Sequence, residues 1–540
     1  MVYAKDFLER IEQLNSIGIA LSVERDHTCL LEKILEGAQA LTNADGGTLY
    51  LVDDEKYLRF EIVRTISQNI AYGGSKGSPV PYDPIPLYIE GDVPDTRTIA
   101  AYSVLSGQIV NIADAYSTPG FDFSGTHAFD EQMSYRSRSL LSIPMRNQRD
   151  EVIGVLQLIN AETVDGEPTV FTPDDQRLVE SLASQAAIAL TNQTLNEDLR
   201  NLLEKFIEVI ANAIDEKSPY TGGHCRRVPD IAMLMADAIQ NIDRGPLAEE
   251  KFTEEQLYEL KIAALLHDCG KITTPVHVVD KATKLETIFD RIHLVHARLE
   301  ILSRDAEIEL LQTKLQHDDD ASTEVINAHK RYEDISQDLD EIKAVLTRCN
   351  VGSEFMPDEA QEKIKEIGSK YHLQFNNEKH PLLTEEEIYN LCIPKGTLTI
   401  EERKIINNHI TTTINMLESL PFPKHLKNVP EIAGGHHERM DGKGYPKGLK
   451  RDEMSVQARL MGIADIFEAL TAADRPYKKA MPLSQAITIL GKMKEEQHID
   501  PDLFDVFIAE KVYLKYAEMY LKEEQIDEIN LDKIPGYTKI

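Results

Sequence analysis

The stretch HHERMDGKGYPKGL, residues 436–449, most constrains what this chain can fold into. Two adjacent histidines, an acidic residue and a Gly-rich turn ending in Gly-Tyr-Pro follow neither helical nor strand periodicity. We interpret His436 and His437 as metal ligands and Gly444-Tyr445-Pro446 as a turn that shapes a substrate loop. The rest of the chain is expected either to complete this site or to control it.

Three further segments place histidine or aspartate among apolar residues. In KIAALLHDCGKI, His267 and Asp268 directly follow an apolar helical end. A carboxylate in such a setting must be paired or metal-bound, because burying it alone costs several kcal/mol. Asp465 lies in QARLMGIADIFEALT, whose apolar residues surround the helix almost completely. His409, in EERKIINNHITTTIN, shares an apolar helical face, and a satisfied core histidine is the alternative interpretation there.

These positions, with no cysteine among them, favour an octahedral nitrogen and oxygen site for iron, manganese or a similar ion. If His436 and His437 lie in a helix, they point about 100° apart, near the cis angle of an octahedral ion. One aspartate can bridge two metals about 3.5–4 Å apart, which together produce a hydroxide for in-line attack on phosphorus. The sequence offers no convincing Ser or Cys nucleophile.

The motifs HDCGK, HHERMDGKGYP and ADIFEALTAADRPYK, with the helix of His409, together resemble an HD-GYP domain, a bacterial subgroup of the HD phosphohydrolases. The resemblance covers residues 205–285 and 391–515. It implies an all-α catalytic domain with a binuclear or trinuclear metal centre, which hydrolyses cyclic dinucleotides, chiefly cyclic di-GMP, to pGpG or GMP. The metal ligands that it implies by position are His224, His267, Asp268, His409, His436, His437 and Asp465.

The same resemblance implies further roles. Asp268 is the bridging carboxylate, and with Lys271 it forms the catalytic pair. The implied substrate contacts, made through phosphate-binding cations and the loop, are Lys271, Gly444, Tyr445, Arg475 and Lys478.

Two departures from the family pattern matter. Family members with a third metal carry a glutamate where this chain has Tyr220, four residues before His224. We therefore expect two divalent ions, iron or manganese by preference, with nickel, cobalt and zinc as alternatives. Glu216, one helical turn further back, is a less favoured substitute ligand. The second departure is an insertion at residues 286–390.

The insertion makes one histidine ambiguous. KLETIFDRIHLVH, ending at His296, and TLTIEERKIINNH, ending at His409, both fit the string before the family's middle histidine. His409 is chosen because its segment runs directly into the one that holds His436. His293, His296 and His329, on long solvated helices, are assigned no metal role.

The amino-terminal part resembles a GAF domain, roughly residues 15–195. Helices, the strand GGTLYLVDD, a second strand LRFEIVRTI, a hairpin with SLLSIPM and VIGVLQLIN, and the helix FTPDDQRLVESLASQAAIAL carry the resemblance. It implies an α+β sensor with an antiparallel sheet, which receives an unknown small-molecule or protein input.

A motif of cyclic-nucleotide-binding GAF domains is only partly matched. Asn160, Phe171 and Asp175 fit it, whereas Ala161 replaces a lysine and Gln176 a glutamate. A degenerate or purely structural sensor is therefore preferred over a cyclic-nucleotide site.

The helix continues beyond this domain with apolar residues at heptad spacing, which are Leu195, Leu199, Leu202, Phe206, Val209 and Ala213. This seam predicts a homodimer through a parallel coiled coil, and packing on its own domain is the alternative.

The predicted organisation is multidomain. The insertion is interpreted as a helical hairpin followed by an irregular segment near residues 356–381. The predicted parts are an N-terminal helix (1–14), the GAF domain (15–195), the linker (196–214), the HD-GYP domain (215–522, interrupted at 286–390) and a C-terminal tail (523–540).

Net charge, apolar runs and cysteine content limit the partners and locations expected for this chain. The net charge of −33 repels nucleic acid and anionic lipid, so a nucleic-acid polymer is not expected as a partner. No apolar run approaches the ~20 residues of a membrane span. Five scattered cysteines suit a reducing compartment, and a cytoplasmic location is expected.

The expected function is GAF-regulated, metal-dependent hydrolysis of cyclic di-GMP. Two alternatives stay open: hydrolysis of another nucleotide such as 3′3′-cGAMP, and a non-catalytic effector that binds cyclic di-GMP or a protein.

Overall fold

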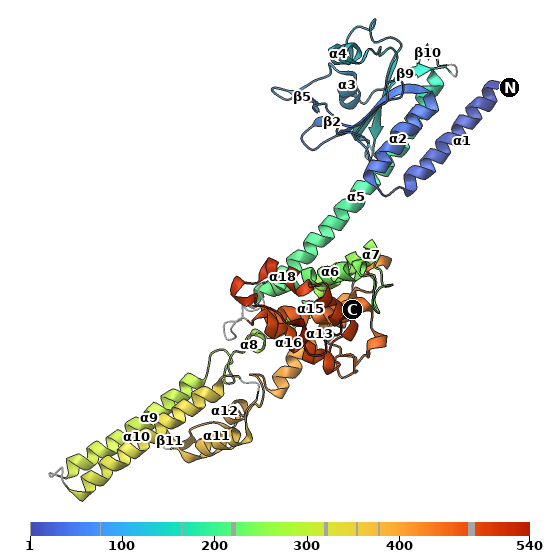
Figure 1. The fold of residues 1–540 in the computed structure, drawn as a ribbon. Coiled ribbons are helices and arrows are strands. Elements are labelled where there is room, and N and C mark those ends of the chain that lie inside the picture. The colour runs from blue at the N-terminus through green and yellow to red at the C-terminus, as the bar shows by residue number, and fades with distance from the viewer. Residues whose placement is uncertain are drawn as a thin grey trace. The chain divides into compact units, whose positions relative to one another are not determined.

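The computed structural model describes residues 2–75, 77–163, 166–217, 223–317, 322–352, 355–375, 378–472 and 481–539. The chain divides into two compact units, residues 1–202 and 203–540 (Figure 1). Among the helices of the described ranges, none is long and apolar enough to cross a membrane.

The first unit is built on an antiparallel sheet with the strand order β3-β2-β1-β9-β8-β7. Strands β8 and β9 form the predicted hairpin, and the short strands β4 and β10 extend the sheet beside β2 and β9. A separate ribbon pairs β5 with β6. The strands are β1 (Ala44–Val52), β2 (Tyr57–Thr65), β3 (Ile70–Tyr72), β4 (Ile85–Pro86), β5 (Tyr88–Ile89), β6 (Val93–Pro94), β7 (Val110–Ile112), β8 (Leu140–Arg146), β9 (Val152–Glu162) and β10 (Pro168–Thr169).

Helices cover both faces of this sheet. Successive strand side chains point to opposite faces, and apolar side chains on each face pack against helices. Leu156 and Leu158 of β9 pack with α1 (Val2–Val23), α2 (His27–Thr42) and the first half of α5 (Pro173–Lys217). Val155 faces the other way, against α3 (Ile99–Ser106), and α4 (Ser124–Met133) lies on that side too (Figure 1). The predicted α+β class with an antiparallel sheet is confirmed. Helix α1 runs unbroken past residue 14, where a boundary was predicted.

The second unit is helical around one large apolar core. Residues 523–539, predicted as a separate tail, contribute Ile534 to this core. The second half of α5 belongs to this unit. The other elements outside the insertion are α6 (His224–Asn241), α7 (Glu254–Leu266), η1 (Cys269–Thr273), α8 (Val276–Val279), α13 (Ile400–Glu418), η2 (Lys424–Leu426), α14 (Val429–Gly434), η3 (Arg451–Glu453), α15 (Val456–Thr471), α16 (Leu483–Glu495), α17 (Pro501–Ala509), α18 (Val512–Tyr520), η4 (Glu523–Gln525) and η5 (Leu531–Lys533).

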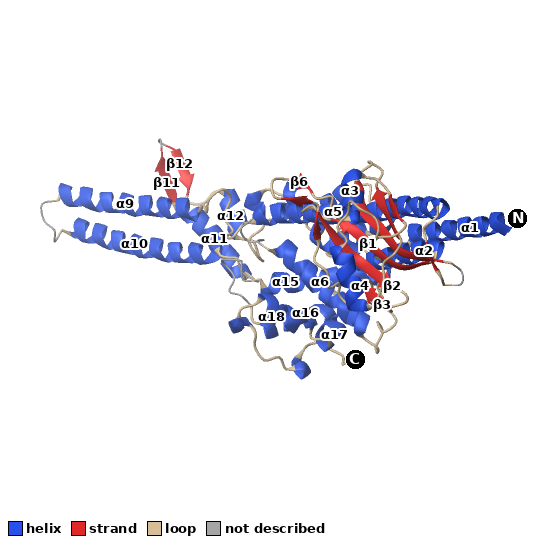
Figure 2. Ribbon diagram, turned by 90° about the horizontal axis from the view of Figure 1, so that it is seen from above, coloured by secondary structure: helices blue, strands red, loops and turns tan. Residues whose placement is uncertain are grey.

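The inserted segment forms a hydrophobic cluster of its own. Helices α9 (Ile292–Gln316) and α10 (Thr323–Asn350) run side by side as the expected hairpin (Figure 2). The prediction of an irregular segment at 356–381 is wrong. Helix α11 (Asp358–Lys370) and the strands β11 (His372–Phe375) and β12 (Glu378–Pro381) lie there, followed by α12 (Glu385–Leu391). Ile364, Ile367 and Leu373 bury their side chains in the cluster, which stabilises both elements.

Candidate metal centre

His267 and Asp268 lie at the end of α7, where the helix enters the core. They are 0% and 1% exposed. His267 caps the helix, and its Nδ1 donates to the carbonyl of Ala264 at 2.7 Å. Its Nε2 therefore faces the cluster, 3.3 Å from Nε2 of His224.

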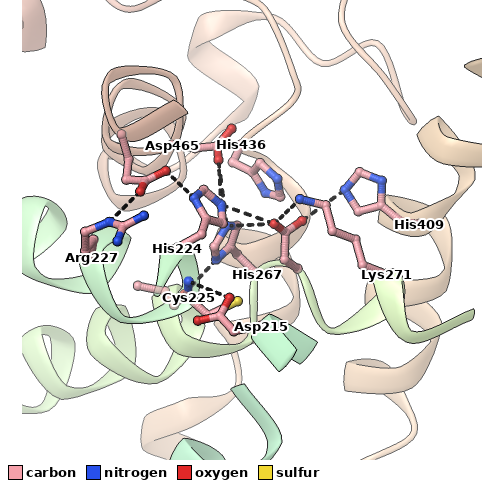
Figure 3. A network of polar contacts seen from close by, with 12 residues as sticks. Asp215, His224, Cys225, Arg227, His267, Lys271, His409, His436 and Asp465 are labelled. Carbon is pink, nitrogen blue, oxygen red and sulfur yellow. Dashed lines mark hydrogen bonds and ion pairs between the residues drawn. The ribbon is translucent and has the colours of Figure 1, made fainter. Parts of the chain in front are cut away.

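Asp268 lies between two groups of imidazoles. Its Oδ2 is 3.2 Å from His224 Nε2 and 3.4 Å from His267 Nε2. Its Oδ1 is 3.1 Å from His409 Nε2. Oδ2 also accepts from the ammonium of Lys271, one turn further along the chain. Each carboxylate oxygen thus faces a different part of the cluster (Figure 3 shows the histidines and the lysine).

Gly270 allows η1 to pack directly against α13. A Cβ at this position would lie 2.0 Å from the carbonyl oxygen of His409. The backbone N–H of Gly270 instead donates to Thr413 Oγ1 at 2.9 Å. The glycine was interpreted from sequence as part of the HDCGK motif, and its physical requirement here is the close approach of the His409 helix.

His409 and His436 repeat the geometry of His267. In each, Nδ1 lies within hydrogen-bond distance of the carbonyl three residues earlier, that of Ile406 and Ala433 respectively. A donor on Nδ1 fixes the tautomer that leaves Nε2 with a lone pair, as in metal-ligating histidines. This backbone geometry orients three imidazoles toward one another.

His436 and His437 do not lie in a helix, as one argument for their ligand angle assumed. Helix α14 ends at Gly434, and both histidines follow in a turn. Their ring centroids are 4.3 Å apart. The ring centroid of His437 lies 5.3 Å from that of His409, so the turn still brings both imidazoles to the cluster.

Helix α15 contributes two acidic side chains. Asp465 Oδ1 lies 3.2 Å from His224 Nε2 and 3.8 Å from His267 Nε2. Glu468, one turn later and 1% exposed, contacts Nδ1 of His224 and accepts from Arg227 Nε at 2.7 Å. The sequence reasoning missed Glu468 and Arg227. The available signal was a second acid three residues after Asp465 in the same apolar helix.

Burial and neighbouring charges shift the pKa values of the imidazoles in different directions. Burial, reinforced by His437 and His267, lowers the pKa of His436 well below its usual value. Burial lowers the pKa of His437 to about 4. Burial would also lower the pKa of His224, but the charge of Glu468 and contacts with nearby carboxylates raise it well above its usual value. His436 and His437 are therefore neutral at pH 7, as metal ligation requires.

The two aspartates are held ionised. Burial would raise the pKa of Asp268, but the charges of Lys271 and His267 hold it well below its usual value. Burial opposes ionisation of Asp465 too, and a hydrogen bond from His224 and nearby imidazoles lowers its pKa strongly. The cluster thus offers anionic oxygens beside the neutral nitrogens of His436 and His437.

Three buried atoms at the centre have no hydrogen-bond partner among the described residues: Asp268 Oδ1, His409 Nε2 and His436 Nε2. Such atoms cost free energy unless something binds them. Three sets of ligand atoms lie within 4.8 Å of one another: His224, His267 and Asp465; His267, Asp268 and His436; and His409, His436 and His437. Unpartnered nitrogen and oxygen donors at this spacing fit divalent metal ions.

All seven sequence-predicted ligands therefore meet in one buried cluster, and Lys271 joins them. Arg475, Lys478 and Tyr220 lie outside the described residues. Glu216 is exposed on α5 and belongs to none of the three ligand sets. His296 contacts Thr347 Oγ1 within the insertion, at 2.9 Å.

The loop after His437 folds back on that residue. The backbone N–H of Tyr445 donates to the carbonyl of His437 at 3.2 Å, and the two rings stack with centroids 4.8 Å apart. A Cβ on Gly444 would lie 2.4 Å from Cα of Glu438, so the turn requires glycine there. The Tyr445–Pro446 peptide bond is cis.

Glu438 braces the same loop from inside. It is 4% exposed and accepts the backbone N–H groups of Lys447 at 2.8 Å and Leu449 at 2.9 Å. Residues 436–449 therefore form one closed loop at the edge of the cluster.

Comparison with known protein families identifies the same two parts of the chain. Residues 26–190 match the family model of the GAF domain, and residues 221–347 and 384–503 each match a model of the HD domain. The chain contains a GAF domain and an HD domain. The first HD match runs on through residues 286–347 of the predicted insertion, and the two matches together leave out residues 348–383.

Several curated relatives share shorter segments with this chain. One is "3'3'-cGAMP-specific phosphodiesterase 3" of Vibrio cholerae, 42% identical over 20% of this chain and 23% of that protein. Another from Vibrio cholerae, "Probable cyclic di-GMP phosphodiesterase", is 36% identical over 25% and 32%. "Cyclic di-GMP phosphodiesterase" of Thermotoga maritima is 32% identical over 25% and 36%. The matched segments thus span about a quarter to a third of these relatives.

The GAF-motif residues serve the fold of the GAF domain. The amide of Asn160 donates to the Tyr135 hydroxyl at 2.9 Å and to the carbonyl of Arg136 at 2.8 Å. Asp175 contacts Arg10 of α1 and accepts from the N–H of Thr172 at 2.7 Å. Arg10 thereby supplies Asp175 with a cation.

Proposed function

We propose that the HD domain is a metal-dependent phosphodiesterase that hydrolyses cyclic dinucleotides. The observation that carries this proposal is Asp268, which turns one carboxylate oxygen to each of two imidazole groups. Beside them lie imidazole nitrogens that have no hydrogen-bond partner among the described residues. Relatives named for hydrolysis of cyclic di-GMP and 3′3′-cGAMP support the substrate class.

We further propose that two divalent ions bind in this cluster. His224, His267 and Asp465 would hold one ion, and His409, His436 and His437 the other, with Asp268 between them. Nitrogen and oxygen donors favour iron or manganese, with nickel, cobalt and zinc as alternatives. When bound, the ions would supply Lewis-acid activation of the scissile phosphate and of the attacking water.

The chain's own cations are proposed to bind and orient the phosphate. Lys271 keeps its charge: burial would lower its pKa, but the carboxylates of Asp268 and Asp465 raise it. Its ammonium can exchange the Asp268 contact for a phosphate oxygen. Arg475 and Lys478 are proposed as further phosphate contacts, and Gly444 and Tyr445 as the loop beside the substrate.

Incubation of the full chain with Mn²⁺ or Fe²⁺ and either cyclic di-GMP or 3′3′-cGAMP tests the function. Chromatography would follow the linear dinucleotide and the mononucleotide, and so also show where hydrolysis stops. We expect turnover of at least one substrate and none by the Asp268→Ala variant. Turnover of neither substrate by metal-loaded wild-type protein would contradict the proposal and favour a non-catalytic effector.

The GAF domain is proposed to receive a small-molecule input. A cavity of 590 Å³ lies between its sheet and the segments that carry α3 and α4. Aromatic side chains, among them Tyr50, Phe60 and Phe129, line it together with Thr48 and Gln157. Such a mixture of aromatic walls and few polar groups is typical of small-ligand pockets.

A homodimer through α5 is proposed as well. The heptad seam is exposed, with side chains between 47% and 66% accessible at Leu195, Leu199, Leu202, Phe206 and Val209. An apolar stripe of this length on a solvent-exposed helix indicates a partner surface. A second copy of the same helix fits it because the spacing is that of a two-stranded coiled coil.

A further inference from the structure

Lys217, the last residue of α5, donates to three backbone carbonyls. Its Nζ lies 2.9 Å from the oxygen of Lys271 and 2.7 Å from that of Thr274, and it also contacts the oxygen of Ile272. An ammonium group has three protons, so these three acceptors match its full donor capacity.

The three carbonyls belong to the turn that follows Asp268. The 3₁₀ helix η1 covers Cys269–Thr273 and includes Lys271. Carbonyls at the carboxyl end of a helix are favourable acceptors for a cation. The carbonyl of Lys271 also accepts the backbone N–H of Thr274 at 3.0 Å. Lys217 therefore fixes the segment that carries the catalytic pair.

Asp215, two residues earlier, fixes another part of the cluster. Its carboxylate accepts the N–H of Gly223 at 3.0 Å and that of Cys225 at 3.2 Å. Gly223 is the N-cap of α6 and has no side chain for capping, so Asp215 supplies the capping acceptor from α5. The first residue of α6 is His224, and Figure 3 shows Asp215 beside the next residue, Cys225.

We propose that the last turn of α5 is a positioning element for the metal centre, acting through Lys217 on η1 and through Asp215 on α6. The proposal rests on the proposed function. Helix α5 begins at Pro173, within the residues that match the GAF domain, and ends at Lys217 without interruption. A shift or rotation of its last turn would move Asp268, Lys271 and His224 relative to the other ligands. Because α5 is continuous, a structural change in the GAF domain reaches the metal centre through this helix.

The test compares two lysines that make the same kind of contact. Lys251 Nζ also meets three carbonyls, those of Ile239, Gln240 and Ile242, at the carboxyl end of α6. That end is about 25 Å from His224, given the rise per residue of the intervening helix. Full-length Lys217→Gln, Lys217→Arg and Lys251→Gln variants would be measured for thermal midpoint, Mn²⁺ affinity by calorimetry, and kcat and KM with cyclic di-GMP.

We expect Lys217→Gln to lower Mn²⁺ affinity and kcat about 10-fold to 100-fold, the range for residues that orient metal ligands. Lys217→Arg should restore most of both, because a guanidinium also donates to several carbonyls. Lys251→Gln should lower the thermal midpoint alone. Unchanged Mn²⁺ affinity and kcat in Lys217→Gln, or equal losses in Lys251→Gln, would overturn the proposal. Absence of wild-type turnover would instead contradict the proposed function, and the Mn²⁺ titration would still test Lys217.

Discussion

Glu468 holds the Nδ1 side of His224, so that Nε2 of this histidine faces Asp268 at 3.2 Å and Asp465 at 3.2 Å. The second carboxylate oxygen of Glu468 is held by Arg227. We predict that Glu468→Gln lowers Mn²⁺ affinity about 10-fold to 100-fold, because the neutral amide loses the charge that orients His224. Calorimetric titration of the full chain measures this effect.

Glu387 provides the matched control. It is a buried glutamate in the insertion, paired with Arg298 at 2.7 Å. Glu387→Gln should lower thermal stability and leave Mn²⁺ affinity unchanged. Equal affinities in wild-type and Glu468→Gln protein would contradict the role given to Glu468.

A second prediction distinguishes His409 from His296. The sequence string that precedes the family's middle histidine fits both of them. His409→Ala should lose bound Mn²⁺ and hydrolysis, because its Nε2 lies 3.1 Å from Asp268 and has no hydrogen-bond partner within the part of the chain that the structure describes. His296→Ala should retain both, since His296 contacts only the hairpin residue Thr347 in the hydrogen bonds described. Metal content after loading and gel filtration measures the difference. The opposite result would show that the family string before His296 is the correct one.

Sequence reasoning located the cluster because its residues break local expectations. Asp268 and Asp465 stand in apolar helical surroundings, where an unpaired acid is costly. The same reasoning found Asp465 and missed Glu468, although Glu468 is the more deeply buried of the two. Which of the two acids on α15 faces α6 depends on the angle at which the two helices cross. The sequence of one helix alone does not determine that angle.

Other errors have similar causes. The β11–β12 hairpin has few apolar residues, among them Leu373, and gave a weak signal. Helix α11 is amphipathic, with Ile364 and Ile367 buried on one face, and the sequence reasoning overlooked this helical spacing. The adjacent His436 and His437 were compatible with a helix, but Gly434 and Gly435 end α14 just before them. Glu438 acquires its role through a loop that closes nine to eleven residues later.

Tyr445 is predicted to act through its ring rather than its hydroxyl. Burial raises the pKa of Tyr445 to about 12, so the phenol stays neutral over the working pH range. Tyr445→Phe should therefore preserve kcat and KM. Tyr445→Ala should raise KM for cyclic di-GMP about ten-fold, within the ~1–3 kcal/mol that a stacked aromatic ring contributes to nucleotide binding. A large loss of kcat in Tyr445→Phe would show instead that the hydroxyl takes part in the reaction.

The α5 seam predicts a specific oligomer. Leu199 and Phe206 are each 62% exposed, and a glutamate at both positions would place like charges across a paired seam. The Leu199→Glu/Phe206→Glu protein should be monomeric by light scattering, whereas wild-type protein should be dimeric. Leu315→Glu, at an 87% exposed site on α9, is the control for added charge and should stay dimeric. A wild-type monomer would contradict the seam as a dimer contact.

Asp500 gives the HD domain a pH-dependent contribution to stability. Its side chain caps α17 through the N–H groups of Asp502 and Leu503, and it pairs with Arg451 and Arg459. Burial would raise the pKa of Asp500, but these hydrogen bonds and charges lower it below its usual value. The folded state therefore holds the carboxylate ionised at pH values where the unfolded chain begins to take up a proton. Its contribution is fully present above the unfolded pKa of about 3.9 and is lost as pH falls through the lower folded value.

We predict that Asp500→Asn lowers the free energy of unfolding at pH 7 by about 3–5 kcal/mol, the cost of breaking a buried ion pair. Urea unfolding of both proteins between pH 7 and pH 3 measures the gap between them. The gap should be constant down to about pH 4 and narrow below it, because the wild-type carboxylate then loses the charge that the variant lacks throughout. Asp532→Asn, at an exposed position, should show no gap at any pH. A gap that widens on acidification would mean that Asp500 is protonated in the folded protein, and that the two arginines are held by other groups.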